Sequence, residues 1–400
     1  MICMGKVMSY WLDSQTNFPA LKHDTHADAV VIGAGITGAS VSYWLSSRCK
    51  TLLLEGETVA SKASGRNAGF LLTGTSDYYN RAVERYGRRK AREVWKLTQQ
   101  NHALLKQHIL KNGIECEYKR SGSYLIVTSK NEMDDIRKSI ALLKRDGFNY
   151  KIIDSKDTNE LLSSKSFYGA AFNEKDGEVN PVKLVRGLIQ AATDKGICIF
   201  ANTPVKKIVK RSNTFEIKTK YGTVTTDYVV LATNAYTPLL YPYFRHAIKP
   251  VRGQVLVTAP YRKLFNGVFY ANYGYEYWRQ LSDGRMLVGG FREIDPRREV
   301  GYRMITTRKI QDKLEKLLYK LSIKSRISYR WAGIMGFSKD HLPLVGSVPK
   351  VKNLLISAGY SGHGLGFSFV TGKMISDKIL YNRSYDIFSP LRSFSQHSIS

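Results

Sequence analysis

The sequence has few cysteines and no long apolar run. The four cysteines are scattered along the chain as Cys3, Cys49, Cys116 and Cys198. They show no C-x-x-C or other metal-ligand spacing, so neither a disulfide framework nor a metal site is expected. No apolar run reaches the roughly 18 residues that span a bilayer, and Asp13 with polar neighbours occupies the place of a secretory apolar region. We expect a cytoplasmic protein without a membrane span.

Acidic residues are also scarce. The chain carries 33 Asp and Glu residues against 61 Lys and Arg residues, which leaves a formal net charge of +28. Such a charge favours anionic partners such as RNA or an anionic membrane. Basic residues concentrate at 81–92 and 301–330, but solvated helix faces explain these segments equally well, and no interleaving of aromatic and basic residues indicates an RNA-binding module. A nucleic acid is therefore an alternative partner that the sequence does not favour.

The stretch 29–55 has the pattern of a dinucleotide-binding βαβ unit. An apolar run at its start predicts a strand buried on both faces, and the sequence GAGITG follows directly at 33–38. Gly33 permits a tight turn, Gly35 lets the backbone approach a pyrophosphate, and Gly38 lets the following helix pack close to the strand. The free N–H groups at the start of that helix favour an anion.

The residues that follow favour FAD over a nicotinamide cofactor. A second apolar strand at 51–54 ends in Glu55, whose carboxylate can bind a ribose 2′-hydroxyl and disfavours a 2′-phosphate. The next loop supplies small and hydrogen-bonding residues, namely Ser64, Gly65, Arg66, Asn67, Ala68 and Gly69. FAD lies extended through its domain and uses a second loop of this kind, whereas a nicotinamide enzyme has no obvious use for it.

The remaining pattern predicts an α/β protein with two domains. A Rossmann-type FAD-binding domain with a parallel sheet is combined with a discontinuous α+β substrate domain, whose sheet is mixed or antiparallel. The expected boundaries are 1–26 for an N-terminal tail, 27–76, 180–240 and 325–385 for the FAD-binding domain, 77–179 and 241–324 for the substrate domain, and 386–400 for a C-terminal tail. Cys198 is expected inside a buried core strand.

Four segments together resemble the D-amino-acid oxidase (DAO) family of flavoproteins. They are the glycine-rich segments at 33–38, 64–69 and 359–366 and the segment WAGIMGFSKDHLPLVG at 331–346. The resemblance extends over residues 9–381 and is closest to the amine-oxidising branch, which includes glycine oxidase, sarcosine oxidase and gamma-glutamylputrescine oxidoreductase. It implies FAD, a split nucleotide domain, a substrate sheet over the flavin, and hydride transfer from an amine C–H to flavin N5.

The resemblance also implies which residues contact cofactor and substrate. Beyond the residues already named, the expected cofactor contacts are Ile36, Thr37, Val205, Ala232, Thr233, Gly333, Met335, Gly362, His363, Gly364, Leu365 and Gly366. The expected catalytic residues are Tyr277, Arg279 and His363. A sheet tyrosine packed in the core fits the pattern at Tyr277 equally well. Asp340 and His341 could form an acid–base pair, but a surface turn is the preferred interpretation.

Two departures from the family pattern concern the substrate. Relatives of glycine oxidase clamp the substrate carboxylate with an arginine at the position of Met335. Either Arg252, Arg279 or Arg292 replaces that arginine, or, as the simpler interpretation, the carboxylate is absent or distant, as in gamma-glutamyl amines. Leu287 stands where sarcosine-oxidase-like members carry a lysine that helps oxygen react. The electron acceptor is therefore O2 or another compound, and both oxidase and dehydrogenase activity stay open.

The sequence thus predicts an FAD-dependent oxidoreductase that oxidises the C–N bond of a small amine or amino acid to an imine, which water hydrolyses. Non-covalent FAD is expected, because the segment 331–340, where some family members tether FAD through cysteine, contains none. One alternative is an FAD-dependent tRNA-modifying oxidoreductase acting on an aminomethyl-uridine side chain, which the charge of +28 would suit. Another is a flavin-binding protein without turnover.

Overall fold

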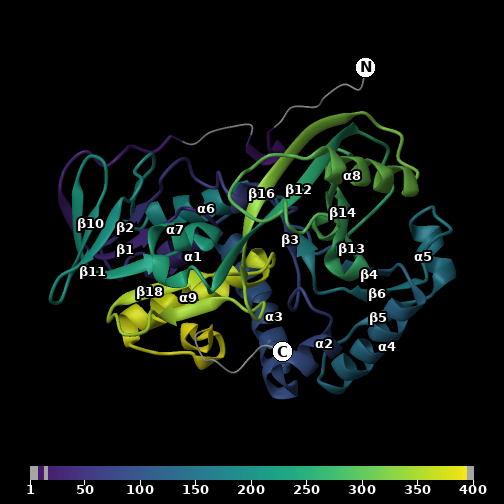
Figure 1. The fold of residues 1–400 in the computed structure, drawn as a ribbon, viewed down its shortest axis with the longest axis horizontal. Helices are drawn as coiled ribbons and strands as arrows, with labels where there is room; N and C mark the ends of the chain where they lie inside the picture. The colour runs from purple at the N-terminus through teal and green to yellow at the C-terminus, as the bar shows by residue number, and fades with distance from the viewer. Residues whose placement is uncertain (1–7, 13–16, 394–400) are drawn as a thin grey trace.

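Two sheets of eight strands each organise the described part of the chain, which comprises residues 8–12 and 17–393 in this computed structural model. The two sheets lie next to each other along the long axis of the molecule (Figure 1). Cys3 and the parts of the expected tails at 1–7, 13–16 and 394–400 lie outside the described residues.

The first sheet contains the predicted βαβ unit. Its strand order is β17 (Leu344–Ser347), β18 (Leu354–Ala358), β11 (Thr223–Leu231), β1 (Thr25–Ile32), β2 (Thr51–Leu54) and β8 (Cys198–Phe200), and β10 (Phe215–Lys218) and β9 (Lys207–Lys210) extend from β11. The strands from β18 to β8 are parallel, whereas β17 is antiparallel. All four residues of β2 and the last four of β1 are buried, as the apolar runs require. The prediction that Cys198 is buried is wrong, because β8 is an edge strand and turns this thiol to solvent.

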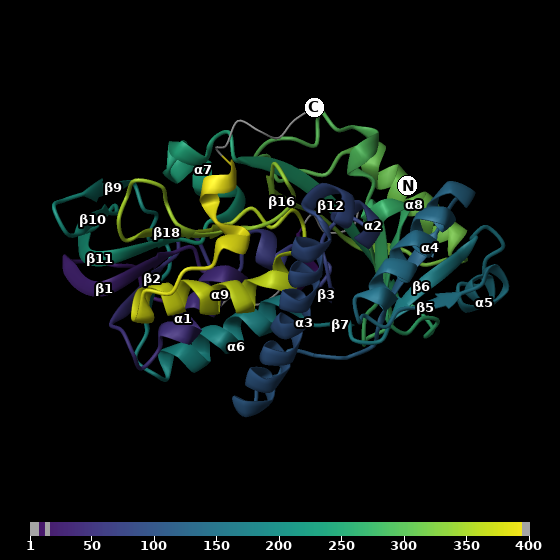
Figure 2. The same ribbon diagram turned by 90° about the horizontal axis from the view of Figure 1, so that it is seen from below.

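Three helices pack together beneath the first sheet. They are α1 (Ile36–Leu45), α6 (Pro181–Thr193) and α9 (Gly364–Tyr381), and Figure 2 shows them beside one another with α3 (Arg88–Lys111) alongside. Small residues permit the close approach of α1 to α9, since a Cβ atom on Gly372 would lie 2.7 Å from the Cβ atom of Ser40. The helix α1, which begins at the turn that follows β1, is thus packed between α6 and α9.

The second sheet is mixed, as predicted. Its order is β16 (Ile327–Ser338), β12 (Ile248–Pro260), β15 (Arg285–Gly290), β14 (Glu276–Gln280), β13 (Val268–Ala271), β4 (Ser123–Val127), β6 (Gly169–Asn173) and β5 (Lys151–Ile153). Only the pair formed by β13 and β4 is parallel among these neighbouring strands. The α/β class with a Rossmann-type sheet and a second mixed sheet is therefore confirmed. The domain boundaries stay a prediction, and β16, which they assign to the FAD-binding domain, pairs with β12.

Side chains alternate between the two faces of the second sheet. One face packs its apolar residues, such as Trp278 and Val288, against α8 (Arg308–Lys320). The opposite face carries Tyr270, Tyr277 and Leu125, and α4 (Lys130–Arg145) packs against its end at β4 and β6. The helix α2 (Tyr79–Tyr86) packs against both α4 and α3 (Figure 2). This second face is the one that turns towards the first sheet.

Shorter elements complete the described chain. They are β3 (Phe70–Leu71), β7 (Gly177–Glu178), α5 (Ser155–Leu161), α7 (Thr237–Leu240) and the 3-10 turns Tyr10–Leu12, Ala63–Gly65, Asn234–Tyr236, Pro242–Phe244, Asn272–Gly274, Arg292–Ile294, Asp386–Phe388 and Pro390–Ser393. No helix within the described ranges is long and apolar enough to cross a membrane. Among the same residues, no group of three or more His, Cys, Asp or Glu side chains could hold a metal ion.

A buried ion pair attaches β12 to the segment that follows β15. Arg252 donates hydrogen bonds of 2.8 and 2.7 Å to the Glu299 carboxylate and one of 2.8 Å to the carbonyl oxygen of Arg298. Gln254 donates a further hydrogen bond of 3.0 Å to Glu299. Both side chains of the pair are almost fully buried, so each charge depends on the other for stabilisation.

Replacing Arg252 by alanine is expected to lower the free energy of unfolding by about 3–5 kcal/mol, because it leaves the Glu299 carboxylate buried without its cation. Unfolding in urea, followed by circular dichroism, would measure the change. As a matched control, Arg211→Ala removes an exposed arginine from its ion pair with Glu216 and should leave the unfolding midpoint almost unchanged. Equal midpoints for the two variants would contradict the structural role of the buried pair.

Candidate active site and cofactor cavity

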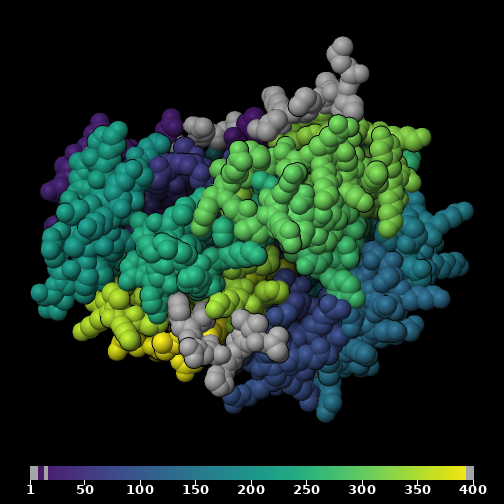
Figure 3. Space-filling model, in the orientation of Figure 1, coloured from purple at the N-terminus to yellow at the C-terminus, as the bar shows by residue number. Residues whose placement is uncertain are grey.

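One cavity of about 600 Å³ lies between the two sheets. Its lining comes from the turn after β1, the loop after β2, the segment after β11, strand β16 and the segment 360–366. Tyrosines of β13 and β14 close it from the second sheet. Figure 3 shows the two sheet-bearing halves of the molecule adjoining across its middle. The volume falls within the range of about 300–1,000 Å³ that is usual for ligand and cofactor sites.

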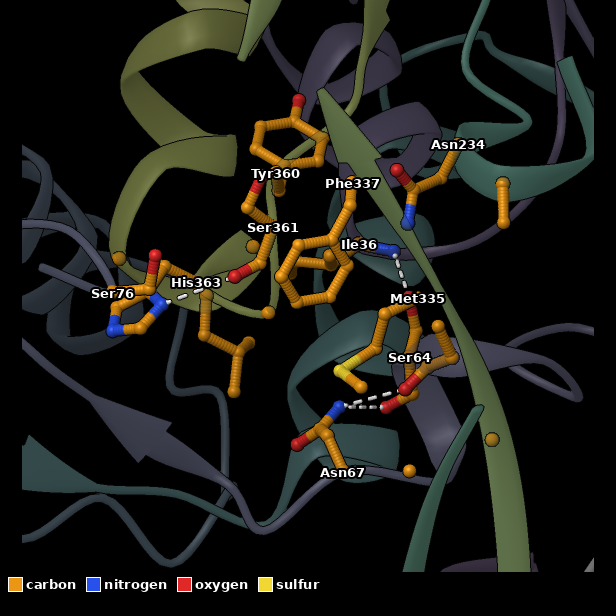
Figure 4. Close-up of a pocket in the computed structure, with 18 of the residues that line it drawn as sticks. Ile36, Ser64, Asn67, Ser76, Asn234, Met335, Phe337, Tyr360, Ser361 and His363 are labelled. Atoms are coloured by element: carbon orange, nitrogen blue, oxygen red, sulfur yellow. Dashed lines mark hydrogen bonds between the residues drawn. The ribbon is translucent and has the colours of Figure 1, made fainter. Parts of the chain in front are cut away.

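The glycine turn after β1 allows a very close approach of backbone segments. Gly33 has a φ of +105°, and a Cβ atom there would lie 2.9 Å from the carbonyl oxygen of Ala232. A Cβ atom on Gly38 would lie 1.9 Å from the carbonyl oxygen of Gly33, so only glycine lets α1 start where it does. The Ile36 N–H donates a 2.9 Å hydrogen bond to Ser64 Oγ across the turn (Figure 4). The N-terminus of α1 therefore faces the cavity, as an anion site requires.

Glu55 occupies the end of β2, where a ribose contact was expected. Its Oε2 accepts a 2.8 Å hydrogen bond from the Ala34 N–H, and its Oε1 accepts one of 2.9 Å from the Glu57 N–H. Burial raises the pKa of the Glu55 carboxyl, and these two hydrogen bonds partly offset that effect. Each oxygen keeps a second lone pair for a ribose hydroxyl. The turn, the helix N-terminus and this carboxylate together fit an extended dinucleotide without a 2′-phosphate.

The loop over 61–69 is fixed by its own side chains and by β16. Arg66 donates hydrogen bonds to the carbonyl oxygens of Ser61 at 2.8 Å and Ala332 at 3.2 Å. Asn67 Nδ2 donates two hydrogen bonds to carbonyl oxygens within the loop, and its Oδ1 accepts one of 2.7 Å from the Gly69 N–H. Both side chains line the cavity, and their polar atoms also brace the loop.

Most of the expected cofactor contacts line the cavity. The structure places there Gly33, Gly35, Ile36, Thr37, Glu55, Ser64, Arg66, Asn67, Ala68, Val205, Ala232, Thr233, Gly333, Met335, Gly362, His363, Gly364, Leu365 and Gly366. Gly38, Gly65 and Gly69 lie outside the lining, where a Cβ atom would approach a backbone carbonyl oxygen within 1.9–2.3 Å. These three glycines therefore serve close packing beneath the site.

Aromatic side chains and one histidine form the wall opposite the glycine turn. The rings of Tyr270 and Tyr277 lie 5.8 Å apart, and His363 lies 6.3 Å from Tyr270. Burial raises the pKa of Tyr277 to about 12 and raises that of Tyr270 as well, so both hydroxyls stay protonated. Burial lowers the pKa of His363 to about 4, and its Nδ1 lies 3.5 Å from the carbonyl oxygen of Ser361 (Figure 4). A neutral imidazole with its proton on Nδ1 leaves Nε2 as an acceptor.

The three arginines considered for a substrate carboxylate have different surroundings. Arg252 is neutralised by Glu299. Arg279 lies outside the cavity lining, where its guanidinium donates to the carbonyl oxygen of Val179 at 3.0 Å and lies 3.6 Å from Glu178. Arg292 lines the cavity and lies over the ring of Tyr275 at 4.4 Å. Within residues 8–12 and 17–393, no carboxylate lies within ion-pair distance of the Arg292 guanidinium.

Asp340 and His341 lie in the turn after β16, as expected, and do not pair with each other. Asp340 forms an ion pair of 2.7 Å with Arg392. His341 has a φ of +66°, and its Nδ1 lies 3.5 Å from the carboxylate of Asp77, which lines the cavity. Leu287 is fully buried and is not part of the lining.

Two residues that line the cavity, Tyr270 and Asn234, were not predicted as site residues from the sequence. The Asn234 Oδ1 accepts a 2.9 Å hydrogen bond from the Gly359 N–H. Tyr270 was detectable only through the pairing of β13 with β14.

Comparison with known proteins agrees with this architecture. A protein-family model described as DAO, FAD dependent oxidoreductase, matches residues 28–378. The probable oxidoreductase OrdL of Haemophilus influenzae is 28% identical over 391 residues, which cover 94% of this chain and 88% of that protein. The gamma-glutamylputrescine oxidoreductase of Escherichia coli is 24% identical over 381 residues, which cover 90% and 85%. The structure of L-proline dehydrogenase from P. horikoshii has a TM-score of 0.78 at 22% identity and covers 93% of this chain and 98% of its own.

Exchange of Glu55 for glutamine is expected to raise the Kd for FAD about 10- to 100-fold, because hydrogen bonds to a charged acceptor contribute about 1.5–3 kcal/mol. The glutamine amide also points an N–H group at the Ala34 or Glu57 N–H. Titration of the FAD-free protein with FAD, followed by flavin fluorescence, measures the affinity. The exposed Glu174→Gln is the control and should bind FAD like the unchanged protein. Unchanged affinity in E55Q would rule out a cofactor contact by this carboxylate.

Proposed function

This chain belongs to the DAO family of FAD-dependent oxidoreductases, and we propose that it oxidises a C–N bond in a small amine or amino acid that carries a carboxylate. The reaction gives an imine that water hydrolyses. FAD is the cofactor, and when bound it supplies the two-electron acceptor for this oxidation. The observation that carries the proposal is the Arg292 guanidinium in the cavity wall, which forms no ion pair in the described part of the chain, since the Glu293 carboxyl interacts with it only beyond ion-pair distance.

The lining supports an assignment of residues to FAD. We propose that the glycine turn at 33–36, Glu55 and the loop at 64–68 hold the diphosphate and ribose end, whereas Met335 and the segment 362–366 adjoin the flavin. Arg66 and Asn67 act mainly by fixing the loop. None of the cysteines in the described ranges lines the cavity, which supports non-covalent binding.

Arg292 favours a substrate with a carboxylate close to the reacting nitrogen. A partly buried guanidinium without an ion pair has lost hydration, which the rings of Tyr275 and Phe337 replace in part and which an anionic group replaces better. The planar fork of the guanidinium matches a carboxylate in a bidentate geometry.

The methionine at position 335, where glycine oxidase relatives have an arginine, favoured a substrate whose carboxylate is absent or distant. The position of Arg292 instead supports a substrate whose carboxylate lies close to the reacting nitrogen. Arg252 and Arg279 give no such support because protein groups already occupy them.

The same wall suits deprotonation of the amine. An amine has to lose its ammonium proton before its C–H bond can be oxidised, and a pocket that excludes water favours loss of this proton to solvent because burial disfavours the charged form. His363, whose pKa is about 4, stays neutral at pH 7 and does not take up the proton, but its Nε2 can accept a hydrogen bond from the neutral amine. The charge of Arg292 also lowers the pKa of an ammonium group nearby. Tyr277 and Tyr270 keep their protons and can donate hydrogen bonds to the substrate.

Arg292→Gln is expected to separate carboxylate-bearing substrates from simple amines. The test mixes anaerobic FAD-loaded protein with matched pairs, such as sarcosine with dimethylamine and phenylalanine with phenethylamine, and follows loss of the flavin absorbance. For each amino acid, the half-saturating concentration should rise about 10- to 100-fold in R292Q, which corresponds to charged hydrogen bonds of about 1.5–3 kcal/mol. The paired amine, which does not use the guanidinium, should be affected little.

Two controls belong to this experiment. Arg297→Gln changes an exposed arginine in the same segment and should behave like the unchanged protein, and Arg292→Lys keeps the charge and should retain part of the preference. An equal loss for acids and amines in R292Q would contradict carboxylate recognition. If no small amine reduces the flavin at all, amine oxidation is contradicted and the tRNA-modifying alternative takes its place.

A further inference from the structure

The cavity continues past the tyrosines into a chamber between the end of the second sheet and the helices α2, α3 and α4. We call this part the apolar chamber. It is lined by Leu125 and Ala171 from the sheet and by Tyr79, Trp95, Ile136, Ile140, Leu143 and Tyr150 from the helices and the segment before β5. These residues belong to the same cavity as the glycine turn and Arg292.

A single row of side chains across the second sheet connects the two parts. Tyr277 of β14 lies opposite Tyr270 of β13 in the strand register, and Tyr270 lies opposite Leu125 of β4. Leu125 in turn lies opposite Ala171 of β6. Residues opposite one another in neighbouring strands project from the same face. The row therefore begins with two tyrosines near His363 and ends with a leucine and an alanine. Its polar side-chain atoms all lie at the tyrosine end.

Most polar groups at the border of the apolar chamber already have protein partners, and the buried Trp95 indole N–H is an exception among the described residues. Ser123 Oγ and Thr73 Oγ1 donate hydrogen bonds of 2.6 and 2.7 Å to the Asp176 carboxylate. Ser139 Oγ donates one of 2.7 Å to Asn80 Oδ1, and the Tyr150 hydroxyl accepts one of 3.2 Å from Asn173 Nδ2.

The tyrosines of α2 and its N-cap are also engaged. The hydroxyls of Tyr78 and Tyr79 donate to the carboxylates of Glu132 and Asp146. What these side chains present to the apolar chamber is mostly ring and methylene carbon. A charged or strongly polar occupant would lose its hydration there without gaining partners, whereas an apolar one gains by leaving water.

We propose that the apolar chamber binds an apolar side group of the substrate, so that the preferred substrates are carboxylate-bearing amines with a bulky aliphatic or aromatic group. This inference rests on the proposed function, because it places the carboxylate at Arg292 and the reacting nitrogen near His363. The side group extends along the row from Tyr270 towards Ala171. Side-chain size beyond Tyr270 thus determines affinity, and compounds as small as glycine leave the chamber unused.

A homologous series of carboxylates tests the proposal without turnover. Acetate, butyrate, hexanoate and 4-phenylbutyrate are titrated into the FAD-loaded protein, and each Kd is read from the change in the flavin spectrum. Each methylene that enters the chamber should tighten binding about fourfold, since burying one CH₂ contributes about 0.8 kcal/mol. Hexanoate should therefore bind on the order of a hundredfold more tightly than acetate.

Two variants show whether the gain arises in the apolar chamber. Ala171→Leu fills it and should abolish the gain for the longer acids while the Kd for acetate and the FAD content stay unchanged. Leu143→Ala enlarges it and should shift the preference towards 4-phenylbutyrate. The control Leu110→Phe adds bulk at an exposed position of α3 outside the cavity lining and should leave the series unchanged.

The outcomes distinguish this proposal from the proposed function. If acetate binds but the longer acids bind no more tightly, the apolar chamber is not a side-group site. The same conclusion holds if the longer acids bind more tightly but A171L and L143A do not change their Kd values. Neither result contradicts amine oxidation. If no carboxylate binds, recognition by Arg292 fails, and the series is repeated with alkylamines from methylamine to hexylamine. A fourfold gain per methylene that A171L removes then supports the chamber, and a flat series overturns it.

Discussion

The contact between the loop at 61–69 and strand β16 is the constraint on which the cavity depends. The Trp331 indole N–H donates a 3.0 Å hydrogen bond to the carbonyl oxygen of Arg66, and Arg66 in turn donates to Ala332. Gly333 allows this approach, because a Cβ atom there would lie 2.9 Å from that of Arg66. These interactions fix the separation of the two sheets. The nucleotide-binding turn of one sheet thus faces the tyrosine row of the other at a distance set by backbone contacts.

The distribution of charge inside the molecule is the basis of the groups that we propose for the cavity. Arg252 and Arg279 are buried next to Glu299 and Glu178, so their charges serve the fold. Arg292 keeps its charge in the cavity wall, and Glu55 provides a carboxylate at the other end. Phenols, the neutral imidazole of His363, the Met335 thioether and glycines form much of the wall between them, together with the Arg66 guanidinium. A dinucleotide and a carboxylate-bearing amine meet these demands in separate regions of one cavity.

The predictable parts of the site are those that local sequence determines. The turn at 33–38 and Glu55 lie within one βαβ unit, so their spacing alone indicated their roles. Arg279 shows the limit of prediction from local sequence. Its position on β14, two residues after Tyr277, suggested a catalytic residue. Its guanidinium instead contacts the carbonyl oxygens of Gly69 and Val179, which lie far away in the sequence. Tyr270 and the apolar chamber depend on the order of β13, β4 and β6, which periodicity does not reveal. Cys198 was misjudged because an apolar run does not show whether its strand lies at an edge.

The most direct test of this account is a crystal structure of the protein with FAD and acetate bound. We predict the FAD diphosphate at the glycine turn 33–36, the flavin ring beside Met335 and His363, and the acetate carboxylate within hydrogen-bond distance of the Arg292 guanidinium. An acetate bound away from Arg292, or a flavin outside the cavity between the two sheets, would contradict the account.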